Sequence, residues 1–198
     1  MNQAIRGDRG VFVDRDGTLI RDVGYLRRRE ELEILPQVPE AIRMLRENGL
    51  KVVVVTNQSA VARGFLGEEE LKDMHRELER RLAGSGAVLD GIYYCPHHPT
   101  EGKAPYRVSC ECRKPGAELA LRAAQELGLD ATRSYVVGDQ VGDMGLASRI
   151  GAKGIFIQNN KAESGKRKAE IEFLIVKDLW EAAQWIVQDL RHRGPSEK

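Results

Sequence analysis

Four polar side chains stand where short apolar runs of the sequence end: Asp14, Asp16, Thr56 and Asp139. These β-branched runs are bounded by polar residues and glycine and are separated by helix-like segments, as is typical of buried parallel strands. In parallel α/β sheets, ligands bind outside the carboxyl ends of the strands. We therefore expect three carboxylates and a threonine hydroxyl to converge on one crevice, which is the layout of an active site.

The paired aspartates predict a metal and, with it, a phosphorylated ligand. Asp14 and Asp16 lie on either side of Arg15, and two carboxylates so close repel unless a cation sits between them or one is protonated. Their oxygens suit a hard cation, magnesium above all, with Asp139 completing the set. Magnesium held by few carboxylates takes a further ligand from a substrate phosphate, so a phosphoryl group is the expected guest.

Other residues could hold that phosphoryl group. Thr56, with the amides of Asn57 and Gln58, can donate to phosphate oxygens, and Lys114 can neutralise their charge. A carboxylate could then attack phosphorus and form an aspartyl-phosphate. The alternative, that the paired aspartates only cap a turn, is common at strand ends. The matching residues at the other strand ends favour catalysis.

A second group of residues forms a C-x-H pair followed by a C-x-C pair: Cys95, His97, Cys110 and Cys112. Three thiolates and an imidazole suit tetrahedral zinc, and because protein fills all four positions the zinc would be structural. It would pin the loop 95–112 beside the active site. A redox pair of Cys110 and Cys112, or three unrelated thiols, are the alternatives. The alternating spacing favours zinc, with His97 rather than its neighbour His98 as the ligand.

Composition limits the class of protein. A chain of 198 residues, 41% hydrophobic, fits a single domain, with its core at about 10–190 and a flexible tail at 194–198. The net charge of +1 predicts no nucleic-acid partner. No apolar run approaches the roughly 20 residues that span a bilayer, and the polar N-terminus lacks a signal-peptide core. We expect a cytoplasmic protein without a membrane partner, and a monomer because no helix carries a sustained heptad pattern.

The elements that must position these residues alternate along the chain. Strands are predicted near 10–14, 51–56, 91–95, 134–138, 153–157 and 173–176, and helices at 38–48, 68–83, 116–127, 141–150 and 178–191. This order predicts an α/β fold with a Rossmann-like parallel sheet sandwiched by helices.

Four motifs, in this order, resemble those of the haloacid dehalogenase superfamily of phosphatases: Asp14-Arg15-Asp16-Gly17-Thr18, Thr56-Asn57-Gln58-Ser59, Arg113-Lys114-Pro115 and Gly138-Asp139-Gln140-Val141-Gly142-Asp143-Met144. Within that superfamily the chain looks like the group of histidinol-phosphatases and D-glycero-D-manno-heptose-1,7-bisphosphate 7-phosphatases, over about residues 10 to 190. The zinc loop is also typical of this group.

The resemblance implies a role for each catalytic residue. Asp14 would be the nucleophile, while Asp16 would protonate the leaving alkoxide and then activate water. Thr56 and Lys114 would steady the phosphoryl group.

The resemblance also implies the metal ligands. Asp14, Asp139 and the main-chain carbonyl of Asp16 would hold magnesium. Asp143 would orient Lys114 or a metal-bound water.

The walls of the pocket are predicted from the same resemblance. Superfamily members often carry a second domain that caps the site, but the intervals between these motifs are too short for one. Loops 22–29 and 96–113 would therefore line the pocket, although a solvated charge run is the alternative for the arginines at 27–29. The candidate substrate contacts are Asp22, Val23, Gly24, Tyr25, Asn57, Gln58, Ser59, Arg107, Arg113 and Gln140.

Three of these contacts bear on the identity of the substrate. Arg107 and Arg113 could bind a second phosphate bidentately, which favours a sugar bisphosphate over histidinol phosphate, whose far end is a cationic amine. Gln140 stands where the heptose enzymes often carry a lysine.

The expected activity is a magnesium-dependent phosphomonoesterase that removes the 7-phosphate of a heptose 1,7-bisphosphate, a small phosphorylated sugar, through an aspartyl-phosphate. The sugar would serve lipopolysaccharide or another surface glycan. Histidinol-phosphate phosphatase is the alternative. A polynucleotide 3′-phosphatase is disfavoured by the near-neutral charge, and a zinc-pinned binding module by the retained aspartates and lysine.

Overall fold

One parallel sheet forms the centre of the molecule in the computed structural model, which describes residues 8–158 and 173–192. Its strand order is β3-β2-β1-β4-β5-β6, and every neighbouring pair is parallel. The strands are β1 Gly10–Val13, β2 Lys51–Asn57, β3 Gly91–Cys95, β4 Tyr135–Gly138, β5 Lys153–Ile157 and β6 Leu174–Val176. All the predicted strands are confirmed, with ends that differ by about one residue at most.

Helices and short 3-10 turns connect the strands. In the described residues they are η1 Arg29–Glu31, α1 Val38–Glu47, α2 Glu68–Gly84, α3 Glu118–Leu127, η2 Ala131–Arg133, α4 Val141–Ile150 and α5 Leu179–His192. The predicted start of α3 at residue 116 was too early. The Gly116 N–H donates to the Arg113 carbonyl at 2.6 Å, so the chain still turns there. None of these helices has the length and apolarity that crossing a membrane requires.

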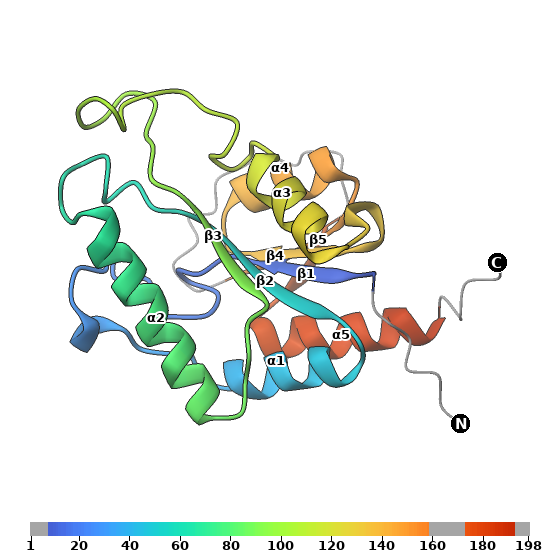
Figure 1. Cartoon of the computed structure of the whole chain (residues 1–198). Coiled ribbons are helices and arrows are strands. Elements are labelled where there is room, and N and C mark those ends of the chain that lie inside the picture. The colour runs from blue at the N-terminus through green and yellow to red at the C-terminus, as the bar shows by residue number, and fades with distance from the viewer. Residues whose placement is uncertain (1–7, 159–172, 193–198) are drawn as a thin grey trace.

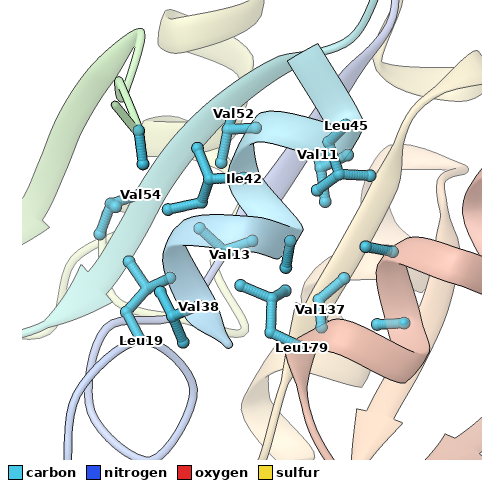
Figure 2. Close-up of a cluster of buried hydrophobic side chains, with 14 of the residues drawn as sticks. Val11, Val13, Leu19, Val38, Ile42, Leu45, Val52, Val54, Val137 and Leu179 are labelled. Atoms are coloured by element: carbon cyan, nitrogen blue, oxygen red, sulfur yellow. The ribbon is translucent and has the colours of Figure 1, made fainter. Parts of the chain in front are cut away.

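The sheet separates two apolar layers because successive side chains along a strand point to opposite faces. Val11 and Val13 pack with residues of α1, α2 and α5, whereas Phe12 packs with residues of α3 and α4. Figure 1 shows α1 and α5 side by side on one face of the sheet and α3 and α4 on the other. In Figure 2, Ile42 and Leu45 of α1 lie over the valines of β1 and β2.

The carboxyl ends of the strands lie along one edge of the sheet, which positions the site. The segments that follow β1, β2 and β3 gather beyond the arrowheads in Figure 1. No additional domain interrupts the described part of the chain between the motifs, as the short intervals predicted. The predicted tail at 194–198 lies outside the described residues.

Candidate active site and metal sites

A buried lysine lies between two carboxylates at this edge. Lys114 Nζ is 2.9 Å from Asp14 Oδ1 and 2.6 Å from Asp143 Oδ1, and the three side chains are less than one tenth exposed. The same ammonium donates to the Val55 carbonyl at 2.7 Å, which ties it to β2. Lys114 is therefore fixed where it can neutralise negative charge beside Asp14.

Burial and the neighbouring charges set the pKa values of Asp14 and Lys114. Burial raises the pKa of the Asp14 carboxyl to about 7; the attraction of Lys114 opposes the shift, while the negative charges of Asp143 and Asp16 add to it. For Lys114, burial alone would lower the pKa, but the two carboxylates outweigh burial and raise it. Lys114 is thus charged, and a further cation beside Asp14 would favour the carboxylate form.

Three carboxylates of this region form a possible cation site. Oxygens of Asp14, Asp139 and Asp143 lie within 4.8 Å of one another. Gly17 permits this approach, since its φ is +75° and a Cβ there would lie 2.1 Å from Asp139 Oδ2. Gln140 Nε2 also donates to Asp139, at 3.3 Å. Crowded carboxylate oxygens of this kind fit magnesium.

The Asp16 carboxylate is held by two side chains. Arg15 Nη2 donates to Asp16 Oδ1 at 3.0 Å, and Gln58 Nε2 donates to Asp16 Oδ2 at 2.8 Å. Gln58 Nε2 also donates to Thr56 Oγ1 at 2.8 Å. The Gln58 amide thereby links Asp16, which follows β1, to Thr56 of β2.

One expectation about the phosphate contacts was wrong. The Gln58 backbone N–H already donates to the Cys95 carbonyl at 2.7 Å, at the end of the β2–β3 pairing, whose last paired residues are Asn57 and Cys95. The side chain of Asn57, another expected contact, hydrogen-bonds the backbone of Lys114. Ser59 is half-buried, and its carbonyl accepts from the Arg63 N–H.

The loop expected to line the sugar site has a defined shape. Asp22 Oδ1 accepts from the Gly24 N–H at 2.7 Å, and Val23 between them is exposed. Tyr25 packs edge-on against Phe65, with ring centroids 4.8 Å apart.

The arginines near this loop differ in their partners. Arg27 lies 4.1 Å above the Phe65 ring, whereas Arg28 forms an exposed ion pair with Glu31, as expected of a solvated charge run. Arg107, in the zinc loop, is exposed. Arg113, just after the loop, donates from Nη1 to the His97 carbonyl at 3.2 Å.

The cysteines and the histidine predicted to bind zinc converge on one point. Cys112 Sγ lies 3.0 Å from Cys110 Sγ, 3.1 Å from Cys95 Sγ and 3.3 Å from His97 Nδ1. All three thiols are free of disulfides. Burial raises the pKa of the Cys95 thiol to about 11, so a bound cation would be needed to hold it as thiolate at neutral pH. This donor set fits tetrahedral zinc.

His98 lies outside that cluster. Its Nδ1 accepts from the Glu101 N–H at 2.9 Å, closing a turn of the loop. The geometry thus brings His97 rather than His98 to the thiols.

One buried residue near the site was missed by the sequence reasoning. His75 of α2 is 6% exposed, and its Nε2 lies 3.1 Å from Arg15 Nη1. The signal was present, because His75 falls at helical spacing between Leu71 and Leu78 on the apolar face of α2.

Known proteins share both this fold and these motifs. Models of haloacid dehalogenase-like hydrolases and of HAD-hydrolase-like proteins match residues 11–80 and 111–182. The chain is 38% identical to the D-glycero-beta-D-manno-heptose-1,7-bisphosphate 7-phosphatase of Haemophilus ducreyi, over 87% of this chain and 97% of that protein. It is 36% identical to the protein of that name from Escherichia coli K12, over 91% and 88% of the two chains.

A solved structure of a related enzyme has the same fold. The crystal structure of D,D-heptose 1,7-bisphosphate phosphatase from B. bronchiseptica, complexed with magnesium and phosphate, superposes with a TM-score of 0.76 at 29% identity, over 91% of this chain and 99% of that one. Fold and motifs define the class of this protein as a haloacid dehalogenase-like hydrolase. Within that class, the chain belongs to the family of D-glycero-beta-D-manno-heptose-1,7-bisphosphate 7-phosphatases.

Proposed function

We propose that this protein is a magnesium-dependent phosphomonoesterase that removes the 7-phosphate of D-glycero-β-D-manno-heptose 1,7-bisphosphate. The strongest support is the buried contact of Lys114 with Asp14, beside Asp16 and Asp139, at the carboxyl edge of the sheet. The heptose substrate and its β anomer follow from the relatives, which carry that name.

In the first step, an Asp14 carboxylate oxygen attacks the phosphorus of the 7-phosphate. The bond between phosphorus and the C7 oxygen breaks, and Asp16 gives its proton to the departing oxygen. Lys114 Nζ, 2.9 Å from Asp14, and the Thr56 hydroxyl stabilise charge on the phosphoryl oxygens. The products are an aspartyl-phosphate on Asp14 and the heptose 1-phosphate.

In the second step, water attacks phosphorus and gives its proton to the Asp16 carboxylate. The bond from phosphorus to the Asp14 oxygen breaks, inorganic phosphate leaves, and both aspartates return to their starting state. Magnesium held by Asp14, Asp139 and the main-chain carbonyl of Asp16 would neutralise the charge of the phosphoryl group. Asp143, 2.6 Å from Lys114, keeps that ammonium in place throughout.

The zinc loop shapes the pocket in this proposal. Zinc held by Cys95, His97, Cys110 and Cys112 is structural, because no ligand position is left open for water. It pins the loop 95–112, from which Arg107, together with the adjacent Arg113, would reach the 1-phosphate. The loop 22–25 and Gln140 would line the sugar. We also propose a single domain that works as a cytoplasmic monomer, as the composition predicts.

The decisive experiment compares phosphate release, with magnesium, from the β and α anomers of the heptose 1,7-bisphosphate and from histidinol phosphate. We expect a preference for the β anomer of about a hundredfold or more in kcat/KM, which corresponds to about 2.7 kcal/mol. Phosphorus NMR should show the 1-phosphate retained in the product. A preference for histidinol phosphate would overturn the sugar assignment.

The isosteric variant Asp14→Asn tests the mechanism. We expect it to fold with an unchanged circular dichroism spectrum and to lose turnover with every substrate. Activity near that of the wild type would remove Asp14 from its role as nucleophile.

A further inference from the structure

The guanidinium of Arg15 is buried and bonded on three sides. Arg15 is 2% exposed, and its Nη2 donates to Asp16 Oδ1 at 3.0 Å and to Gln58 Oε1 at 2.8 Å. Its Nε donates to Asp16 Oδ2 at 3.2 Å. The remaining side of the planar group, Nη1, meets His75 Nε2 at 3.1 Å. Arg15 therefore holds Asp16 directly and also holds Gln58, the other side chain bonded to Asp16.

His75 acts as an acceptor in this contact. Arginine has only donors, so His75 Nε2 must be unprotonated and the ring proton must lie on Nδ1. Burial, and then the positive charge of Arg15, lower the pKa of His75 to about 3, which keeps the imidazole neutral. The ring is also packed against Tyr94, with centroids 5.4 Å apart. A rigid acceptor on α2 thus fixes the far end of the guanidinium.

We propose that His75 is a positioning residue for the acid–base step: through Arg15 it aims the Asp16 carboxyl at the oxygen of the leaving group. The proposal rests on the proposed phosphatase function, in which Asp16 gives up a proton as the phosphorus–oxygen bond breaks. Proton transfer requires hydrogen-bond reach, and a small displacement of a catalytic group lowers the rate strongly. Without the acceptor on α2, one arm of the guanidinium is left unpaired in a buried site, and the plane that orients Asp16 is free to turn.

The leaving group distinguishes positioning from plain structural support. A sugar alkoxide must take a proton from Asp16 as it departs, whereas p-nitrophenolate is stable as an anion and departs without one. The bond that forms, from Asp14 to phosphorus, is the same for both esters. Because kcat/KM reports the steps up to loss of the leaving group, a misplaced Asp16 should impair the sugar ester more than the aryl ester.

The experiment measures kcat/KM for heptose 1,7-bisphosphate and for p-nitrophenyl phosphate in the wild type, His75→Leu and His75→Gln. We expect His75→Leu to lower kcat/KM for the sugar at least about tenfold more than for the aryl ester. His75→Gln should stay within about threefold of the wild type for both, because its Oε1 can accept from Arg15 Nη1. If His75→Leu does not fold, His75→Met replaces it with a side chain that is a much weaker acceptor.

Leu78→Ala is the matched control, because Leu78 is fully buried one turn further along α2 and belongs to the apolar core rather than to the site. It should lower the thermal stability and leave the ratio of the two kcat/KM values unchanged. An unchanged ratio in His75→Leu, with a loss of stability like that of Leu78→Ala, would overturn the proposal and leave the phosphatase function standing. A wild type that hydrolyses neither ester would instead overturn the proposed function, and this inference with it.

Discussion

Asn57 and Lys114 are joined by two reciprocal hydrogen bonds. The Lys114 backbone N–H donates to Asn57 Oδ1 at 2.9 Å, and Asn57 Nδ2 donates to the Lys114 carbonyl at 3.2 Å. Asn57 is the last residue of β2, so the pair fastens the backbone of Lys114 to the sheet. The side chain of Lys114 donates to Val55 of the same strand, at 2.7 Å. Lys114 is therefore held at both ends while its ammonium faces Asp14.

Removing this attachment should weaken catalysis. Asn57→Ala loses both hydrogen bonds, which together contribute about 1–3 kcal/mol, so we expect kcat/KM for the sugar bisphosphate to fall roughly ten- to hundredfold. Steady-state kinetics with thermal melts would measure this. Asn48→Ala, which removes an exposed amide at the end of α1, is the control and should keep full activity. Equal activity in the two variants would show that Lys114 needs no support from Asn57.

The positions of the carboxylates could be predicted because they depend on strand ends alone. The apolar strands β1 and β4 are buried on both faces of the sheet, and Asp14 and Asp139 directly follow them. Because parallel strands have their carboxyl ends at one edge, the two aspartates meet there. The convergence of Cys95, His97, Cys110 and Cys112 could be predicted because donors that alternate along a short loop have few other arrangements.

The side chains that hold Asp16 could not be predicted in the same way. The contacts of Arg15 with Gln58 and His75 join residues 43 and 60 positions apart, and their geometry depends on how α2 packs against the sheet. The direction of the Gln58 amide was mispredicted for a related reason, since it depends on how far β2 and β3 remain paired. The local sequence pattern predicts neither the packing of α2 against the sheet nor the extent of the β2–β3 pairing.

Gly17 offers a test of the cation site. Its φ of +75° resembles that of Gly64 at +72°, but a Cβ at Gly17 would meet Asp139 Oδ2 at 2.1 Å, whereas a Cβ at Gly64 would have no neighbour within 4 Å. Both Gly→Ala changes should cost about 1–2 kcal/mol of stability through the backbone. Only Gly17→Ala should also raise the magnesium concentration for half-maximal activity, by about tenfold or more, because it displaces Asp139. Magnesium titrations of activity would show the difference; equal magnesium requirements would remove Asp139 from the metal site.

The neighbouring histidines of the zinc loop allow a paired test. His97 Nδ1 lies 3.3 Å from Cys112 Sγ, whereas His98 Nδ1 accepts from the Glu101 N–H. We expect His97→Asn to lose most of its zinc, measured by atomic absorption, and to melt roughly 5 °C or more below the wild type, since metal binding contributes to folding. His98→Asn should retain about one zinc per chain. Zinc retained by His97→Asn, or lost by His98→Asn, would reassign the fourth ligand.

His75 should make the stability of the protein sensitive to acid. Burial and the charge of Arg15 lower its pKa from 6.5 to about 3, so below about pH 6.5 the unfolded chain binds a proton that the folded protein does not. The contribution of neutral His75 to the free energy of unfolding is complete above pH 6.5. It is lost as the pH falls toward 3, at up to about 1.4 kcal/mol per pH unit. Urea unfolding should therefore show that the free energy of unfolding falls between pH 7 and pH 4.5 in the wild type. In His75→Gln this fall should be smaller, by up to about 3 kcal/mol.

The control for this titration is His192→Gln, which changes an exposed histidine at the end of α5. Its loss of stability over the same pH range should match that of the wild type, because this substitution leaves the buried contact between His75 and Arg15 intact. If His75→Gln were as acid-sensitive as the wild type, the imidazole of His75 would have to accept a proton in the folded protein. Its contact with the Arg15 guanidinium could then not persist below pH 6.5, because two groups that only donate have no hydrogen bond to share.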